Sequence, residues 1–499
     1  MSLKQYIAKQ WAKRAVAKTQ RWAKEPSKTQ ERALRDLVNK AKGTAFGQDH
    51  DFAHIKTYAD FVLRVPVCDY EGLRPYVERV VAGEEDVLWP GKPLYFSKTS
   101  GTTSGVKYIP ISKESMPTHI KTAQNALFHY IHHTGNSSFV DGKMIFLQGS
   151  PIMAEKNGIQ TGRLSGIVAH YVPSYLQRNR LPSWETNCME DWEQKVDAIV
   201  DETIDEDMRL ISGIPPWVNM YFERLKAKSG KSITELFPHF SLFVYGGVNY
   251  APYRGVLEEL MGKRVDSVEL YPASEGFIAF QDTPDEEGLL LQLDSGIFYE
   301  FIEAEKINEK NPTRHSISEV KLGVNYAIIL NTSAGLWGYN IGDTVEFVSL
   351  SPYRIVVTGR IKHYISAFGE HVIGKEVERA MQEVLTIHKA RVTEFTVAPQ
   401  VTPQDGLPHH EWWIAFEQPP KDIASFASDL DEAMCGQNTY YDDLIQGAVL
   451  RPLVVKALPA NAFEQYMSSI GKLGGQNKTP RLTNDRKIAD QLNKLFSIK

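Results

Sequence analysis

The chain has 499 residues, enough for two or three domains with a large buried core. Hydrophobic residues make up 42% and charged residues 23%, which are ordinary values for a globular protein. The 56 basic and 61 acidic residues give a net charge of −5. This balance argues against a nucleic-acid-binding protein, because such proteins usually carry a strongly basic face.

The three cysteines, Cys68, Cys188 and Cys435, lie far apart, and no CxxC pair occurs. This spacing predicts neither a disulfide framework nor a cysteine-based zinc site. No apolar run approaches the length of a membrane span, and the N-terminal segment lacks the apolar core of a secretory signal. We therefore expect a cytoplasmic protein without a membrane span.

The first 25 residues are basic and follow a helical pattern. One interpretation is an amphipathic segment that touches a membrane surface or serves as a transit peptide. The other is a helix that packs Ile7, Trp11, Ala15 and Val16 onto the body of the protein, with its lysines in water. We favour the second, because most such stripes are core faces.

The predicted elements then alternate between strands and helices. Helices fill the first ninety residues, and an extended run at 94–96 leads into the polar segment 97–105. The following pattern predicts strands at 108–111, 144–147, 242–245 and 265–271 and helices at 113–133, 217–225 and 253–261. This alternation is typical of an α/β fold.

Short strands from 289 to 357 indicate a meander or a barrel, and a mixed set of helices and strands follows residue 360. We therefore predict a large N-terminal domain at 1–357, with β-sheets or a β-barrel flanked by helices. A hinge at 358–366 and a smaller, mobile α+β domain at 367–499 complete the expected organisation.

The segment 99–107 combines five hydroxyl side chains with two glycines between apolar runs. Glycines allow backbone N–H groups to converge on an anion, and hydroxyls add donors, so this segment suits a phosphate-binding loop. The GxxxxGK[ST] spacing is absent, so it is not a Walker A loop. The alternative is a flexible surface loop.

The second motif is 269–276, at the end of a predicted strand. The carboxylate of Glu275 beside the Ser274 hydroxyl offers oxygen ligands for Mg²⁺, and Tyr271 offers a flat face for a base. The alternative is an ordinary turn that Ser274 caps, with Glu275 in solvent.

Three weaker motifs follow. Asp343 comes directly after Gly342 between predicted strands, where a carboxylate can accept the hydroxyls of a ribose or occupy a hairpin. Arg360 lies at the proposed domain joint, where a solvated linker is the alternative. The glycine-rich, basic segment 471–481 suits a loop that delivers the Lys478 ammonium to a developing negative charge, or a solvated loop.

Taken together, the order and spacing of these segments resemble the adenylate-forming superfamily that includes luciferase and the acyl-CoA ligases. More narrowly, they resemble the auxin-responsive acyl-acid amido synthetases and their bacterial relatives. The resemblance extends from Val65 to Arg481. The sequence departs from the family pattern at Thr103, where serine is common, at Pro272, where smaller residues are common, and at Asn340, where arginine is common.

The resemblance implies that ATP and Mg²⁺ bind and that a carboxylic acid is activated as its acyl-adenylate. An amine, expected to be an amino acid, then takes the acyl group. Lys478 is the implied catalytic residue, Glu275 the metal ligand, and Asp343 with Arg360 the ribose site. The implied ATP-binding residues are Thr99, Ser100, Gly101, Thr102, Thr103, Ser104, Tyr271, Ala273, Ser274, Glu275, Asp343 and Arg360.

Two other functions fit the same pattern. An acyl-CoA ligase would use the same first step with a different acceptor. A non-catalytic nucleotide-binding scaffold would keep the fold, but it would be free to lose Glu275, Asp343 and Lys478, which are all present. The sequence identifies neither the acid, nor the amine, nor the oligomeric state.

Overall fold

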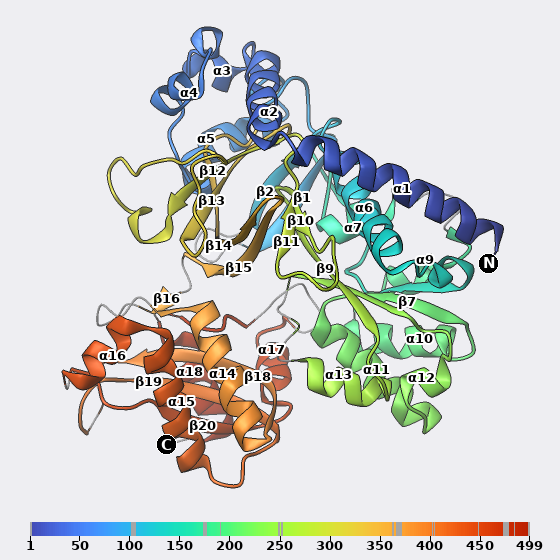
Figure 1. Ribbon diagram of the computed structural model, residues 1–499, viewed down its shortest axis with the longest axis vertical. Helices are drawn as coiled ribbons and strands as arrows, with labels where there is room; N and C mark the ends of the chain where they lie inside the picture. The colour runs from blue at the N-terminus through green and yellow to red at the C-terminus, as the bar shows by residue number, and fades with distance from the viewer. Residues whose placement is uncertain are drawn as a thin grey trace. The chain divides into compact units, whose positions relative to one another are not determined.

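The computed structural model describes residues 2–100, 106–172, 177–189, 191–247, 250, 253–361, 364–365, 372–401, 403, 405–447, 449–472, 479–483 and 485–497. The chain forms two compact units (Figure 1). The first comprises Met1–Val248 and Leu260–Val356, and the second comprises Asn249–Glu259 and Val357–Lys499. Both units mix helices and strands, which confirms the α/β class with a large N-terminal and a smaller C-terminal part.

The helices as far as residue 261 belong to the first unit, apart from the last of them, most of which belongs to the second unit. They are α1 (Leu3–Ala23), α2 (Pro26–Ala41), α3 (Ala45–Asp49), α4 (Tyr58–Arg64), α5 (Tyr70–Val81), α6 (Met116–Thr134), α7 (Leu164–Ala169), α9 (Trp184–Asn187), α10 (Trp192–Thr203), α11 (Pro215–Ser229), α12 (Ile233–Leu236) and α13 (Arg254–Met261). Short 3₁₀ turns are η1 (Phe52–His54), η2 (Ser138–Asp141) and η4 (Ala304–Lys306).

One sheet of eleven strands has the order β12-β13-β14-β15-β11-β10-β9-β8-β7-β3-β6. Its strands are β3 (Lys143–Phe146), β6 (Arg180–Leu181), β7 (Met208–Ser212), β8 (Leu242–Gly246), β9 (Asp266–Ala273), β10 (Gly276–Phe280), β11 (Leu289–Leu291), β12 (Ile297–Glu303), β13 (Asn325–Thr332), β14 (Tyr339–Leu350) and β15 (Tyr353–Arg360). Strands β6, β3, β7, β8 and β9 run parallel, whereas β9 to β11 and β12 to β14 pair antiparallel.

A second sheet of the first unit has the order β2-β1-β5-β4. Its strands are β1 (Tyr95–Ser100), β2 (Val106–Ile111), β4 (Ala154–Lys156) and β5 (Ile159–Gly162). Strand β1 pairs antiparallel with β2 and parallel with β5. The predicted strand at 94–96 is observed as β1 at 95–100, and the polar Ser97 within it has no exposed surface.

Helix α1 packs on α6 (Figure 1). The buried face of α1 includes Ala8, Ala12 and Val16. The sequence predicted Ile7 and Trp11 on this face, but both are exposed, by 39% and 43%. The buried stripe is offset by one position because alanines allow two helices to approach closely. Only Val16 of the predicted set is fully buried, and Ala15 is half-buried.

The second unit contains a three-stranded sheet of order β18-β19-β20, with β18 (Arg391–Gln400), β19 (His409–Gln418) and β20 (Val454–Pro459). Trp412 and Ile414 of β19 pack toward α14 and α15, whereas Trp413 and Ala415 pack toward α17 and α18, as the two-residue period of a strand requires. Its other elements are β16 (Tyr364–Ile365), β17 (Val372–Ile373), α14 (Gly374–His388), α15 (Ile423–Gln437), α16 (Thr439–Gln446), α17 (Ala462–Ser469) and α18 (Lys487–Phe496).

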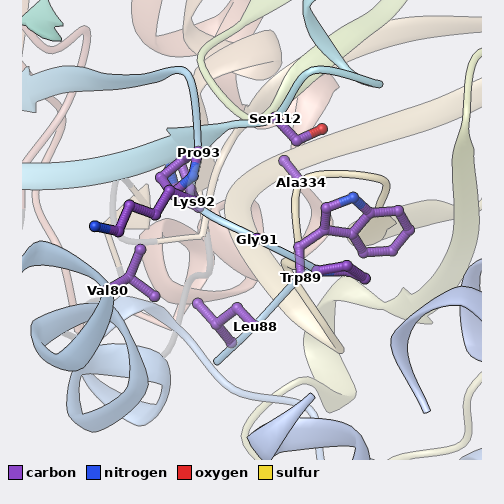
Figure 2. A pocket seen from close by; sticks show the side chains of 10 residues that line it. Val80, Leu88, Trp89, Gly91, Lys92, Pro93, Ser112 and Ala334 are labelled. Carbon is purple, nitrogen blue, oxygen red and sulfur yellow. The ribbon is translucent and has the colours of Figure 1, made fainter. Parts of the chain in front are cut away.

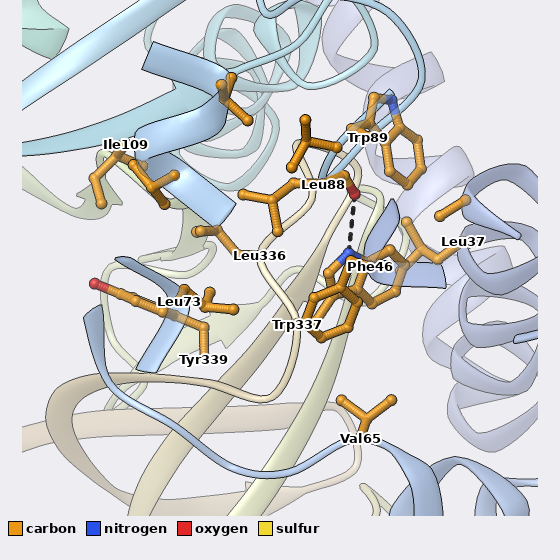
Figure 3. Close-up of a cluster of buried hydrophobic side chains, with 14 of the residues drawn as sticks. Leu37, Phe46, Val65, Leu73, Leu88, Trp89, Ile109, Leu336, Trp337 and Tyr339 are labelled. Carbon is orange, nitrogen blue, oxygen red and sulfur yellow. Dashed lines mark hydrogen bonds between the residues drawn. The ribbon is translucent and has the colours of Figure 1, made fainter. Parts of the chain in front are cut away.

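A large aromatic cluster joins the N-terminal helices to the segment before β14 (Figure 3). Trp337 has no exposed surface, stacks near Phe46 with ring centroids 6.1 Å apart, and meets Phe52 edge-on at 4.9 Å. Its indole N–H donates to the carbonyl oxygen of Leu88 at 3.0 Å. This cluster fixes the backbone that enters β14.

Gly338, the residue after Trp337, lies at a close approach between two backbone segments. Its φ is +54°, and a Cβ atom there would lie 2.2 Å from the carbonyl oxygen of Pro66. Only glycine fits both the left-handed conformation and the close approach of this backbone.

We predict that Gly338→Ala destabilises the protein by about 1–3 kcal/mol more than Gly323→Ala does, measured by chemical denaturation. Gly323 is the matched control, because its φ of +73° carries a similar conformational cost but a Cβ atom there meets nothing within 4 Å. Equal destabilisation by the two substitutions would show that the contact with Pro66 is not restrictive.

Candidate active site

The turn between β9 and β10 carries the second sequence motif. Ala273 pairs with Gly276, so Ser274 and Glu275 form a two-residue connection, and both side chains are half-buried. The turn lies at the carboxyl end of β9, whose neighbour β8 runs parallel to it. In α/β sheets, ligands bind at this edge of the parallel strands.

Strand β1 meets this turn directly. The hydroxyl groups of Ser97 and Ser274 lie 2.8 Å apart, within hydrogen-bond distance. Thr99 and Ser100 follow in the same strand, where they pair with Lys107 and Val106 of β2. The start of the predicted phosphate loop is therefore tethered beside Ser274. The expected site residues Gly101, Thr102, Thr103 and Ser104 lie outside the described residues.

A second hydrogen bond joins β9 to β14. The Tyr271 hydroxyl donates to Oδ2 of Asp343 at 2.6 Å, and only 8% of each residue is exposed. The sequence had suggested that Asp343 lies between two strands, but it lies within β14. A buried carboxylate requires a hydrogen-bond donor, and Tyr271 supplies one.

Tyr339 and Glu275 are coupled electrostatically. Burial and, to a smaller extent, the negative charge of Glu275 raise the pKa of the Tyr339 phenol far above its ordinary value, so this group stays protonated. Nearby, burial raises the pKa of the Cys68 thiol to about 12. A thiol with this pKa is neutral near pH 7, and Cys68 is not an activated nucleophile.

A buried ion pair joins strand β12 to the segment that follows it. Nε and Nη2 of Arg314 donate to the two carboxylate oxygens of Glu300 at 2.8 and 2.6 Å, and the two side chains are 5% and 0% exposed. Asn331 and Tyr58 donate to the same carboxylate at 2.9 and 3.0 Å, and Arg314 also donates to the carbonyl oxygen of Val65. The Glu300 carboxylate thus has four hydrogen bonds, as a buried charge requires.

Asn331 links the Glu300 carboxylate to the start of β14 by hydrogen bonds. Its side-chain oxygen accepts from the backbone N–H of Gly338 at 2.7 Å. The carbonyl oxygen of Gly338 then accepts from the N–H of Cys68, and that of Cys68 accepts from the N–H of Asn340, at 2.9 and 2.8 Å. The position of the strand that carries Asp343 therefore depends on the Glu300–Arg314 pair.

Two predicted site residues belong to the second unit. Arg360 is exposed and ends β15, and Lys478 lies outside the described residues. The chain just after Lys478 is anchored on β18. The Thr396 hydroxyl donates to the carbonyl oxygen of Pro480 at 2.7 Å, and the N–H of Val397 donates to the carbonyl oxygen of Arg481 at 2.8 Å. One end of the predicted lysine loop is therefore held on a strand.

Two hollows in the first unit lie apart from these residues. One encloses about 10 Å³, too little for more than a single water molecule, and Figure 2 shows its lining beside Trp89. The other has about 200 Å³ and lies along α2. The lining of neither includes a predicted site residue.

The described part of the chain contains no cluster of three or more His, Cys, Asp or Glu side chains that is arranged to hold a metal ion. Within the same residues, no helix is both long enough and apolar enough to cross a bilayer.

Sequence reasoning assigned no role to three residues of this region. Ser97 precedes the predicted phosphate loop but gave no signal of its own. Glu300 stands in an apolar run, Ile297–Phe298–Tyr299–Glu300–Phe301, and such a charge requires a buried partner. Nothing in the sequence identified Arg314 as that partner.

We predict that Glu300→Gln lowers the free energy of unfolding by about 3–5 kcal/mol, because it leaves Arg314 buried without a counter-charge. The exposed Asp197, which pairs with Arg224 at 2.7 Å, is the matched control. Asp197→Asn should cost less than about 1 kcal/mol. Chemical denaturation compares the two, and a similar small loss for both would contradict the structural role of Glu300.

Comparison with known proteins places these observations in a family. The chain matches the GH3 family N-terminal domain over residues 15–183, the GH3 family central domain over 290–360 and the GH3 family C-terminal domain over 375–487. It is 22% identical to the jasmonoyl-L-amino acid synthetase JAR4 of Nicotiana attenuata, over 92% of this chain and 91% of that protein. It is also 22% identical to the jasmonoyl-L-amino acid synthetase GH3.5 of Oryza sativa subsp. japonica, over 84% and 86%.

Solved structures show the same fold. The acyl acid amido synthetase AtGH3.15 in complex with 2,4-DB superposes with a TM-score of 0.79 at 16% identity, over 97% of this chain and 96% of that one. A 2-hydroxyisobutyryl-CoA ligase in its postadenylation state superposes with a TM-score of 0.60 at 12% identity, over 94% and 92%. From its three domain matches and this shared fold, the chain belongs to the GH3 family.

Proposed function

We propose that this protein activates a carboxylic acid as its acyl-adenylate with ATP and then transfers the acyl group to an amine, expected to be an amino acid. The observation that carries the proposal is the pair of hydrogen bonds Ser97–Ser274 and Tyr271–Asp343. They bring together three segments that are far apart in the sequence and that resemble the phosphate, adenine and ribose segments of adenylate-forming enzymes.

In the first half-reaction, a carboxylate oxygen of the acid attacks the α-phosphorus of ATP, and pyrophosphate leaves. Thr99 to Ser104 hold the phosphates, Tyr271 with Ala273 and Ser274 contacts the adenine, and Asp343 with Arg360 binds the ribose. Lys478 stabilises the charge that develops on the reacting phosphate. These groups act by positioning and by electrostatic stabilisation.

Glu275 is the proposed ligand of Mg²⁺. Its carboxylate lies in a half-buried turn, and Mg²⁺ typically takes one or two protein carboxylates together with substrate phosphates. When bound, the metal would neutralise charge on the phosphates.

In the second half-reaction, the nitrogen of an amine attacks the carbonyl carbon of the adenylate. The bond between this carbon and the oxygen that bridges to the phosphorus breaks. AMP leaves with the bridging oxygen, and the nitrogen loses a proton. An amine is favoured over CoA because the relatives that match most of the chain are named amino acid synthetases. The fold alone is shared with a CoA ligase.

We also propose that residues 358–366 act as a hinge between a large domain at 1–357 and a small domain at 367–499. The second compact unit resumes at Val357, and Gly359 has a φ of 152°, which few other residues adopt. A cytoplasmic location is supported by three cysteines that form no disulfide.

The direct test is pyrophosphate release from ATP and Mg²⁺ with a panel of carboxylic acids, each with amino acids, with CoA or with neither. We expect acid-dependent release that rises with amino acids. Lys478→Ala should lower the rate at least about 100-fold, because it removes a charge that acts on the transition state.

Lys487→Ala is the control, because the Lys487 side chain is 84% exposed in the same unit. It should leave the rate unchanged. If CoA stimulated pyrophosphate release and amino acids did not, the acceptor would be the thiol of CoA and not an amine. Folded protein that binds ATP but releases no pyrophosphate with any acid would support the scaffold alternative.

A further inference from the structure

We infer that the outer face of α1 is a docking surface for an anionic lipid membrane. This inference rests on α1 alone and is independent of the proposed reaction.

The inner face of α1 is fixed at both ends, which determines the side chains that point outward. At the N-terminal end, Ser2 and Gln5 donate to the Asp141 carboxylate at 2.6 and 2.7 Å. Near the other end, the buried Thr19 hydroxyl lies 3.1 Å from Nε2 of His129. The helix therefore presents one constant face to solvent.

The N-terminal half of this outer face is apolar. Leu3 is 75% exposed, Tyr6 51%, Ile7 39% and Trp11 43%. Residues three and four apart share one face of a helix, so Leu3, Tyr6 and Ile7 form a continuous patch that continues to Trp11. The Trp11 ring also contacts the ring of Phe128 on α6 edge-on, with ring centroids 6.2 Å apart, which holds Trp11 in place.

The same helix is strongly basic. The first 24 residues contain seven of the 56 basic residues and none of the 61 acidic ones, so the rest of the chain has a net charge of −12. Most of these cations are exposed; the seven are Lys4, Lys9, Lys13, Arg14, Lys18, Arg21 and Lys24.

An anionic bilayer fits this combination of features. A helix of 21 residues spans about 30 Å, and its cations are spread along that length rather than gathered at one point. A lipid surface offers delocalised negative charge for the cations and an apolar layer for Leu3, Tyr6 and Ile7.

The test is co-sedimentation of the full-length protein with vesicles of phosphatidylcholine alone or mixed with phosphatidylglycerol, at low and at high salt. We expect at least about tenfold stronger binding to the anionic vesicles at low salt, reduced at high salt.

Two double variants separate the contributions. Leu3→Ser with Ile7→Ser removes the apolar patch, and Lys13→Glu with Arg14→Glu reverses charge on the outer face; each should weaken binding about tenfold or more. Leu63→Ser and Lys487→Glu are controls at exposed positions on other helices and should bind as the wild type does.

All four substituted positions of α1 are exposed, so we expect unchanged thermal unfolding, which checks the fold. Absence of vesicle binding by the wild type would overturn the inference. Equal binding to neutral vesicles, or loss of binding in the controls, would also overturn it.

Discussion

A carboxylate with no exposed surface is stable in a protein only when its charge is fully compensated, and Glu300 meets this condition through Arg314, Asn331 and Tyr58. These three partners come from three different parts of the chain. Each one joins the pair to another element: Tyr58 to α4, Arg314 to the backbone at Val65, and Asn331 to Gly338. The ion pair thus orders the N-terminal helices and the entry to β14 at once.

The candidate active site inherits its geometry from this arrangement. Asp343 lies on β14, whose start is held by Gly338 and Asn340, while Tyr271 reaches it from β9. Side chains on strands are positioned more rigidly than side chains on loops. A site for ribose and adenine gains from that rigidity, because catalysis by positioning tolerates little displacement.

Much of the fold was predictable from local pattern. The strands β3 and β8 appear as short apolar runs between turns, and the helices α6 and α11 follow a clear helical period. The placement of Glu275 in a turn at the end of β9 also followed from the strand pattern and the residues after it.

The rest depended on tertiary contacts that no local pattern contains. The strand β1 continues through Ser97, whose hydroxyl finds a hydrogen-bond partner in Ser274, 177 residues away. The predicted buried face of α1 is displaced by one residue from the observed one. The alanines that pack on α6 are less hydrophobic than Ile7 and Trp11, so the sequence pattern pointed to the larger residues. Arg314 gave no signal, because its role arises only from Glu300 across the fold.

The central claim is that an acyl-adenylate lies on the reaction path, and isotope transfer tests it most directly. The acid that supports turnover would be labelled with ¹⁸O in its carboxylate, and the products of one turnover with the amine would be analysed by mass spectrometry. Attack of the carboxylate on the α-phosphorus predicts that one labelled oxygen appears in AMP and none in pyrophosphate. Unlabelled AMP, or label in inorganic phosphate, would contradict adenylate formation.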